Sequence, residues 1–291
     1  MLAGATAAPG FWDWSFDPPL VLVVVFAILF WLGDRRTLTP ARERGARRRQ
    51  GASFYAGLAV LAIALGSPLD ILSEQLFWAH MVQHVLLIVL APPLIVLARP
   101  WIRLWRALPL GVRRPLARGL GQGERTRWLR GLSRTLGSPP AGFLAFSGVL
   151  LAWHVPVLFD ATLRSNALHA LEHTLFFATA LMFWKQVIES PPLHARLSAV
   201  QRVGYLIGAM VVSWILAVVL ALAPHPLYAS YAHEASRPGG ISALTDQQIA
   251  AGIMWVPGSI TFVIVIFAYV HRWLAPAPPG PTRAARLASG H

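Results

Sequence analysis

The sequence predicts an all-α membrane protein, a single bundle of seven transmembrane helices. Two features of its composition lead to this prediction: 56% of the 291 residues are hydrophobic while 13% are charged, and the mean hydropathy is +0.55. The third observation is that apolar stretches recur, each close to the ~20 residues that cross a bilayer core as a helix. Cysteine is absent, which excludes disulfides, thiolate metal sites and cysteine nucleophiles.

The predicted spans follow one another through short connections, except for one long basic connection at residues 99–140. No Lys or Arg precedes the first apolar run, so we expect an uncleaved first span. The seven spans lie near residues 18–33, 52–66, 76–98, 141–159, 166–187, 203–223 and 248–270. We expect one domain over residues 1–275 and a disordered cytoplasmic tail at 276–291.

Basic residues are distributed unevenly between the connections. All but Arg164 and Arg237 of the 25 Lys and Arg residues fall on one side of the predicted bundle, and most acidic residues fall on the other. Because basic connections stay in the cytoplasm, the N-terminus is predicted outside and the C-terminus inside. The net charge of +13 follows from this topology, so no nucleic-acid partner is expected.

The basic connection at 99–140 interleaves arginine with tryptophan and leucine and is broken by Pro109 and Pro115. This pattern is typical of short amphipathic helices that lie on anionic lipid headgroups. The alternative is a docking surface for a partner protein.

Two histidine pairs have the spacing of one helical turn. His80 and His84 lie in the third span, and His169 and His173 lie in the fifth, so each pair occupies one helix face. His154 lies near the outer end of the fourth span. Five histidines on three helices therefore share one level in the outer half of the membrane, where ionisable groups are expensive and usually functional.

These histidines predict a metal or haem site. A polar network that holds the bundle together is the main alternative, and a proton or ion pathway is a further one. Neutral imidazole is a common ligand whose second nitrogen needs an orienting partner. Further candidate ligands or supporting residues near this level are Met81, Gln83, Asn166, Glu172, Asp246, Gln247 and Met254.

Prolines mark the predicted bends. Pro92 and Pro93 lie in the third span, Pro156 follows His154, and Pro257 follows Met254 in the seventh span. Each proline removes a backbone donor and can kink its helix, which would open the outer half of the bundle.

Four stretches together resemble the seven-span cytochrome c oxidase assembly factor family, the CtaG-like membrane proteins associated with caa-type oxidases. They are His80-Met-Val-Gln-His84 running into Ala91-Pro-Pro-Leu, Trp153-His154-x-Pro156, His169-x-x-Glu172-His173, and Asp246-Gln-Gln followed by Met254-Trp255. The resemblance covers spans two to seven. It implies a protein of the bacterial inner membrane that helps to mature a haem-copper oxidase, with oxidase subunits or another assembly factor as partners.

The resemblance also implies copper handling, and the residue types are compatible with it, because His and Met suit Cu(I) and His with oxygen suits Cu(II) or zinc. We expect His80, His84, His169 and His173 as ligands, His154 as a fifth member, and an opening to the outer face.

Two other functions remain open at this stage. One is a b-type cytochrome that holds haem between two histidines. The other is a zinc hydrolase, because His169-Ala-Leu-Glu172-His173 matches H-x-x-E-H with Glu172 as general base. We expect no enzymatic activity, which the zinc hydrolase alternative would contradict.

Overall fold

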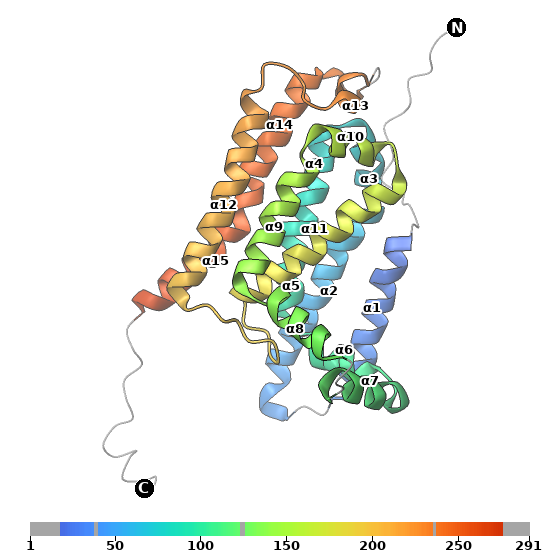
Figure 1. The fold of residues 1–291 in the computed structure, drawn as a ribbon, viewed down its shortest axis with the longest axis vertical. Helices are drawn as coiled ribbons and strands as arrows, with labels where there is room; N and C mark the ends of the chain where they lie inside the picture. The colour runs from blue at the N-terminus through green and yellow to red at the C-terminus, as the bar shows by residue number, and fades with distance from the viewer. Residues whose placement is uncertain (1–17, 38–39, 123–125, 235–236, 276–291) are drawn as a thin grey trace, which may run out of the picture.

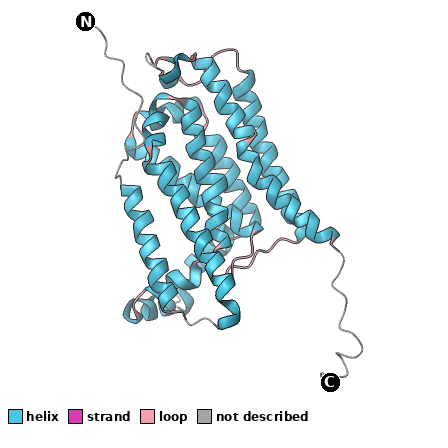
Figure 2. Ribbon diagram, turned by 180° about the vertical axis from the view of Figure 1, so that it is seen from behind, coloured by secondary structure: helices cyan, strands magenta, loops and turns pink. Residues whose placement is uncertain are grey.

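A computed structural model describes residues 18–37, 40–122, 126–234 and 237–275. The predicted tail at 276–291 lies outside these ranges. The described part of the chain consists of helices and their connections and contains no β-strand, which confirms the all-α prediction (Figures 1 and 2).

The helices form an elongated bundle with short helices at both ends. The first half contains α1 (Pro18–Arg35), α2 (Arg44–Gly66), α3 (Pro68–Gln75), α4 (Phe77–Val85), the π-helical segment η2 (Leu86–Leu90), α5 (Ala91–Leu97), α6 (Trp101–Ala107) and α7 (Leu110–Gln122). The second half contains α8 (Arg127–Leu136), α9 (Pro139–Trp153), α10 (Pro156–Leu163), α11 (Asn166–Val187), α12 (Ala199–Leu222), α13 (Ala229–Ala232), α14 (Ala243–Trp255) and α15 (Pro257–Leu274). Short 3₁₀ turns lie at Ala41–Glu43 and Pro238–Gly240.

Three helical rods are each long and apolar enough to cross a bilayer: Phe77–Leu97, Ala199–Leu222 and Ala243–Leu274. Two bent pairs pass the same test together, α2 with α3 (45°) and the end of α8 with α9 (68°). The described residues thus contain three to five candidate spans. Asn166, His169, Glu172 and His173 make the first half of α11 unusually polar for a membrane helix.

The observed helices follow the predicted ranges, except that 141–159 and 248–270 are each divided into two helices. Helix α11 covers the whole of 166–187, and α4, η2 and α5 together fill 76–98. The range 141–159, predicted as one helix, is two helices, because α9 ends at Trp153 and α10 begins at Pro156. A proline cannot donate to the preceding turn and disfavours helical backbone in the residue before it.

The other predicted bends also lie at their prolines. Helix α14 ends just before Pro257, and the π-helical segment η2 precedes Pro92 and Pro93. Neither proline can offer an N–H to the Ile88 carbonyl, which instead accepts a hydrogen bond of 2.9 Å from Nε1 of Trp184. This bond attaches α11 to the irregular segment below the histidine pair of α4.

The basic connection is helical, as its pattern predicted. Helices α6, α7 and α8 lie at one end of the bundle, which we call the basic end (Figure 1). Apolar side chains of α7 and α8 stay exposed, with Leu110 at 54% and Trp128 at 65% exposure. Exposed apolar residues among arginines suit a surface that contacts lipid headgroups.

The opposite end carries α3, α10 and α13, and we call it the site end. Serine side chains cap the first turns of α3, α9, α11, α12 and α14 by accepting backbone hydrogen bonds. Helix α4 has no cap from its own segment. The backbone N–H groups of its first turn instead donate to a side chain of another helix. This contact positions the histidines of α4.

Candidate metal site in the helical bundle

Asp246 of α14 caps the start of α4 across the bundle. Its fully buried carboxylate accepts hydrogen bonds from the backbone N–H groups of Phe77 (2.9 Å) and Trp78 (2.8 Å). Charge-assisted bonds of this kind satisfy donors that a helix start leaves open. His80 lies in the next turn, so Asp246 fixes the position of the helix that carries it.

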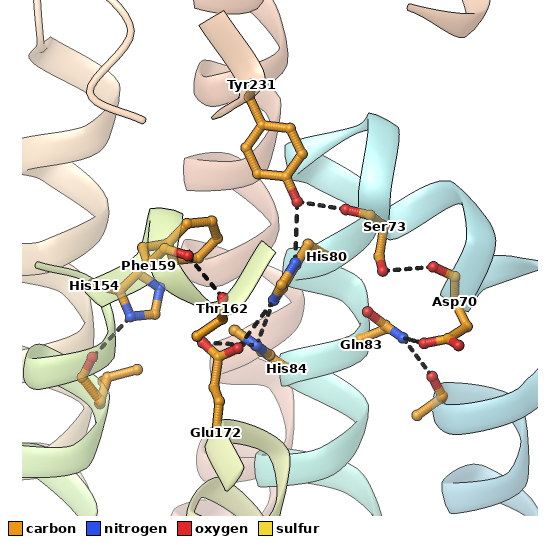
Figure 3. A network of polar contacts seen from close by, with 12 residues as sticks. Asp70, Ser73, His80, Gln83, His84, His154, Phe159, Thr162, Glu172 and Tyr231 are labelled. Carbon is orange, nitrogen blue, oxygen red and sulfur yellow. Dashed lines mark hydrogen bonds and ion pairs between the residues drawn. The ribbon is translucent and has the colours of Figure 1, made fainter. Parts of the chain in front are cut away.

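His80, His84, Glu172 and His173 form a compact group that we call the His-Glu cluster. One ligand atom from each lies within 4.8 Å of the corresponding atoms of the others. Nε2 of His80 is 2.9 Å from Nε2 of His84, and the Glu172 carboxylate oxygens are 3.7 Å from the first nitrogen and 3.6 Å from the second (Figure 3). The cluster therefore joins two residues of α4 to two of α11.

The His-Glu cluster is shielded from water. His80 and Glu172 are 0% exposed, while His84 and His173 are 3% and 8% exposed. The site therefore lacks the opening to the outer face that the sequence led us to expect. Its acceptors also lack donors, because both Glu172 oxygens and Nε2 of His173 have no hydrogen-bond partner. A buried polar group without a partner is destabilising by about 1–3 kcal/mol, and a charged group by more.

A hydrogen-bond chain sets the protonation of His80. The Tyr231 hydroxyl donates to the Ser73 carbonyl, so its oxygen is left to accept from Nδ1 of His80 at 3.0 Å (Figure 3). His80 therefore carries its ring proton on Nδ1 and directs the lone pair of Nε2 into the cluster. A ligand histidine commonly needs such a partner on its second nitrogen.

His154 likewise donates its Nδ1 proton to a protein oxygen. It lies at the break between α9 and α10, where its Nδ1 donates to the Leu150 carbonyl at 2.8 Å. Its Nε2 is buried and has no hydrogen-bond partner. The imidazole centroid of His154 lies 6.0 Å from that of His84, as far apart as the centroids of His80 and His173 within the cluster, but His154 is not among the residues whose ligand atoms lie within 4.8 Å of one another.

His169 lies beside the cluster on α11. Its ring centroid is 4.2 Å from that of His173 and 5.1 Å from that of His80. Its side chain is half-buried, and its Nε2 has no hydrogen-bond partner. The five predicted histidines thus lie in one neighbourhood, with His80, His84 and His173 at its centre.

The remaining predicted residues lie around this centre. Gln83 donates to the Ala64 carbonyl and to Asp70, both at 2.7 Å, and so ties α4 to α2 and α3. Gln247 joins the Leu220 carbonyl to the Leu227 N–H, and Asn166 is exposed at the start of α11. Met81 and Met254 are buried and line a small cavity with His84 and His154.

The sequence analysis included Glu172 among the candidate ligands or supporting residues and missed Tyr231 and Asp160. Glu172 contributes an oxygen to the cluster. Asp160 accepts hydrogen bonds from the backbone N–H groups of Ala229 and Ser230 and so holds α13, which carries Tyr231, over the cluster. Neither residue has a spacing signal, because Asp160 of α10 and Tyr231 of α13 meet only through the packing of these two helices, which the sequence pattern does not specify.

The hydrogen-bond chain leads to a testable prediction. Replacing Tyr231 with Phe removes the acceptor for His80 and should lower metal affinity by about 10–100-fold, as outer-partner changes commonly do. Tyr228→Phe is the matched control, since the buried Tyr228 hydroxyl donates to the backbone carbonyl of His154 and to no imidazole. Competition titration of the purified variants measures the effect. Equal affinities of the two variants would show that Tyr231 does not orient His80.

The chain is similar in sequence to mycobacterial proteins. The chain is 25% identical over 265 residues to an uncharacterized protein of Mycobacterium bovis and 26% identical over 268 residues to one of Mycobacterium leprae. Each match covers 89% of this chain but 39% of the relative, so the chain spans about two fifths of the length of these relatives. No solved structure matches significantly.

A family model adds the decisive comparison. The model described as cytochrome c oxidase caa3 assembly factor matches residues 24–275, a range that contains every residue of the His-Glu cluster. The match covers most of the chain and agrees with the family resemblance of the sequence motifs. The chain therefore belongs to the cytochrome c oxidase caa3 assembly factor family.

Proposed function

We propose that this protein handles copper for a haem-copper oxidase and that the His-Glu cluster holds the ion as cargo. The observation that carries the proposal is the convergence of three imidazoles and one carboxylate, buried and with unpartnered acceptor atoms, within 4.8 Å. A cation would satisfy the acceptors that the protein itself leaves without donors. The family supplies the assembly role, and the cluster supplies the chemistry.

The geometry of the cluster suits a single ion. Ligands about 2.0–2.1 Å from a tetrahedral metal lie about 3.3 Å from one another. The separations of 2.9, 3.6 and 3.7 Å between the His80, His84 and Glu172 atoms bracket this value. Small side-chain movements would therefore suffice to accept an ion between His80, His84 and Glu172.

Haem is less compatible with this arrangement. Axial histidines must face each other across a porphyrin, and cofactor pockets occupy about 300–1,000 Å³. The His80 and His84 nitrogens are in hydrogen-bond contact, and the cavity beside His84 has a volume of about 40 Å³.

The same small cavity argues against a zinc hydrolase, which needs room for a substrate beside its metal. Glu172 also faces two imidazole nitrogens, where it suits a ligand better than a general base. Zinc binding as such remains compatible with this donor set. Copper is favoured because the family serves an oxidase whose maturation requires it.

The charge of the cluster supports a monovalent or divalent cation. Glu172 brings one negative charge when ionised, and the three imidazoles are neutral ligands. Cu(I) with this carboxylate has no net charge, which limits the penalty for burying an ion in a low-dielectric interior. His169 and His154 lie next to the cluster and are positioned to accept the ion as it enters or leaves.

We further propose seven spans within one domain at residues 1–275, with the N-terminus outside and the C-terminus in the cytoplasm of a bacterium. The charge asymmetry of the connections supports this orientation. At the basic end, Arg36, Arg106 and Arg113 line an open cavity of about 760 Å³. Anionic lipid headgroups suit this cavity, and an oxidase subunit or another assembly factor would approach the protein within the same membrane.

Single cysteines can test the orientation, since the chain has none of its own. Glu74 and Ala232 are exposed at the site end, and Ser133 is exposed on α8. A membrane-impermeant thiol reagent applied to intact cells should label Cys at the first two positions and not at Ser133. Labelling at Ser133 alone would reverse the orientation and place the His-Glu cluster near the cytoplasm.

The copper role predicts the phenotype of a ligand variant. His173→Ala removes one of four ligands and should lower metal affinity by about 100-fold or more, because even outer-partner changes cause losses of 10–100-fold. The helices keep their internal backbone hydrogen bonds, so the variant should still be present in the membrane. The oxidase in that strain should contain less copper, which metal analysis of the purified oxidase measures.

His194→Ala is the matched control, because His194 is exposed in the connection between α11 and α12, far from the cluster. Immunoblots must show that both variants reach wild-type abundance. A fully copper-loaded oxidase beside normally abundant His173→Ala protein would contradict copper handling. Loss of the His173→Ala protein itself would assign the cluster a structural role.

A further inference from the structure

A second group of soft donors lies on the other side of His84. A cavity of about 40 Å³ is bounded by Met81 and Met254 together with His84, His154 and Ser213, and its other lining residues are apolar. Met81 is 0% exposed and Met254 is 6% exposed. Two thioethers from α4 and α14 thus line one cavity with two imidazoles.

His154 is available as a ligand in this cavity. It is 5% exposed, and its Nδ1 proton is committed to the Leu150 carbonyl. The lone pair of its Nε2 has no hydrogen-bond partner. His84 is in a similar state, because its Nδ1 is buried without a partner while its Nε2 belongs to the His-Glu cluster.

The cavity is large enough for one small ion or one water molecule, since a water needs roughly 10–15 Å³ of such space. A water here would bond to His154 Nε2, His84 Nδ1 and the Ser213 hydroxyl. It would leave both thioethers without a strong partner, because their sulfur is a weak acceptor that cannot donate. Soft thioether ligands favour Cu(I) over harder divalent ions, and imidazole is a compatible ligand. The Glu172 carboxylate, 3.6 Å from His84, supplies a nearby negative charge.

We propose that Met81, Met254 and His154 form a second position for Cu(I), next to the His-Glu cluster and sharing His84 with it. This inference rests on the proposed copper role and extends it from one position to two. The two positions differ in chemistry: one includes a carboxylate, and the other includes sulfur. Neutral imidazole has one lone pair, so His84 binds an ion at one position at a time, and its ring proton changes nitrogen when the ion changes position. No electron transfer is required.

The test uses the full-length protein in detergent, loaded with Cu(I) under anaerobic reducing conditions. Because the chain has no cysteine, any copper–sulfur scattering in X-ray absorption must come from methionine. Wild-type protein should show this sulfur shell. The Met81→Leu/Met254→Leu double variant should lose it together with one Cu(I) equivalent in a competition titration. Leucine keeps similar volume and apolarity, so the fold should be retained.

Met210→Leu is the matched control, because Met210 is a buried methionine of α12 that does not line the cavity. It should retain both the sulfur shell and the Cu(I) stoichiometry. The proposal is overturned if wild-type protein lacks copper–sulfur scattering, if the double variant retains it, or if Met210→Leu loses it equally. The copper content of the oxidase in the His173→Ala strain is a separate measurement. Failure of the second Cu(I) position can therefore be distinguished from failure of the proposed copper role.

Discussion

The arrangement at the site end depends on one constraint, the burial of a carboxylate among imidazole nitrogens. Glu172 is fully buried, and neither of its oxygens accepts a hydrogen bond. Such a group is unfavourable in a low-dielectric interior unless a cation or a proton accompanies it. The nearby His80 and His154 do not supply that proton, because their Nδ1 protons are donated to other oxygens.

The rest of the fold holds these groups in place. Asp246 fixes the start of α4, Gln83 ties its middle to α2 and α3, and Trp184 joins α11 to the carbonyl left open by the paired prolines. Each of these bonds connects segments distant in the sequence and uses a polar group that would otherwise be unsatisfied within an apolar bundle. The polar network that the sequence left open as an alternative to a metal site therefore surrounds the His-Glu cluster and supports it.

The all-α class and the helix ranges could be predicted from the length and periodicity of the apolar stretches. The same periodicity predicted that the paired histidines share one helix face. The spacing of His80 and His84 could be read as one helix face because it depends only on the helical repeat. The break at His154 was missed as a helix end because Pro156 indicated only a bend. The positions of Tyr231 and of Glu172 in the His-Glu cluster depend on how α13 and α11 pack against α4, which local patterns do not encode.

The central claim is that the His-Glu cluster binds copper, and electron paramagnetic resonance of purified protein loaded with one equivalent of Cu(II) tests it most directly. We predict a single bound Cu(II) with hyperfine coupling to imidazole nitrogen. The signal should disappear in a His80→Ala/His173→Ala variant and persist in His194→Ala. An unchanged spectrum in the double variant, or the absence of bound Cu(II) from the wild-type protein, would contradict the claim.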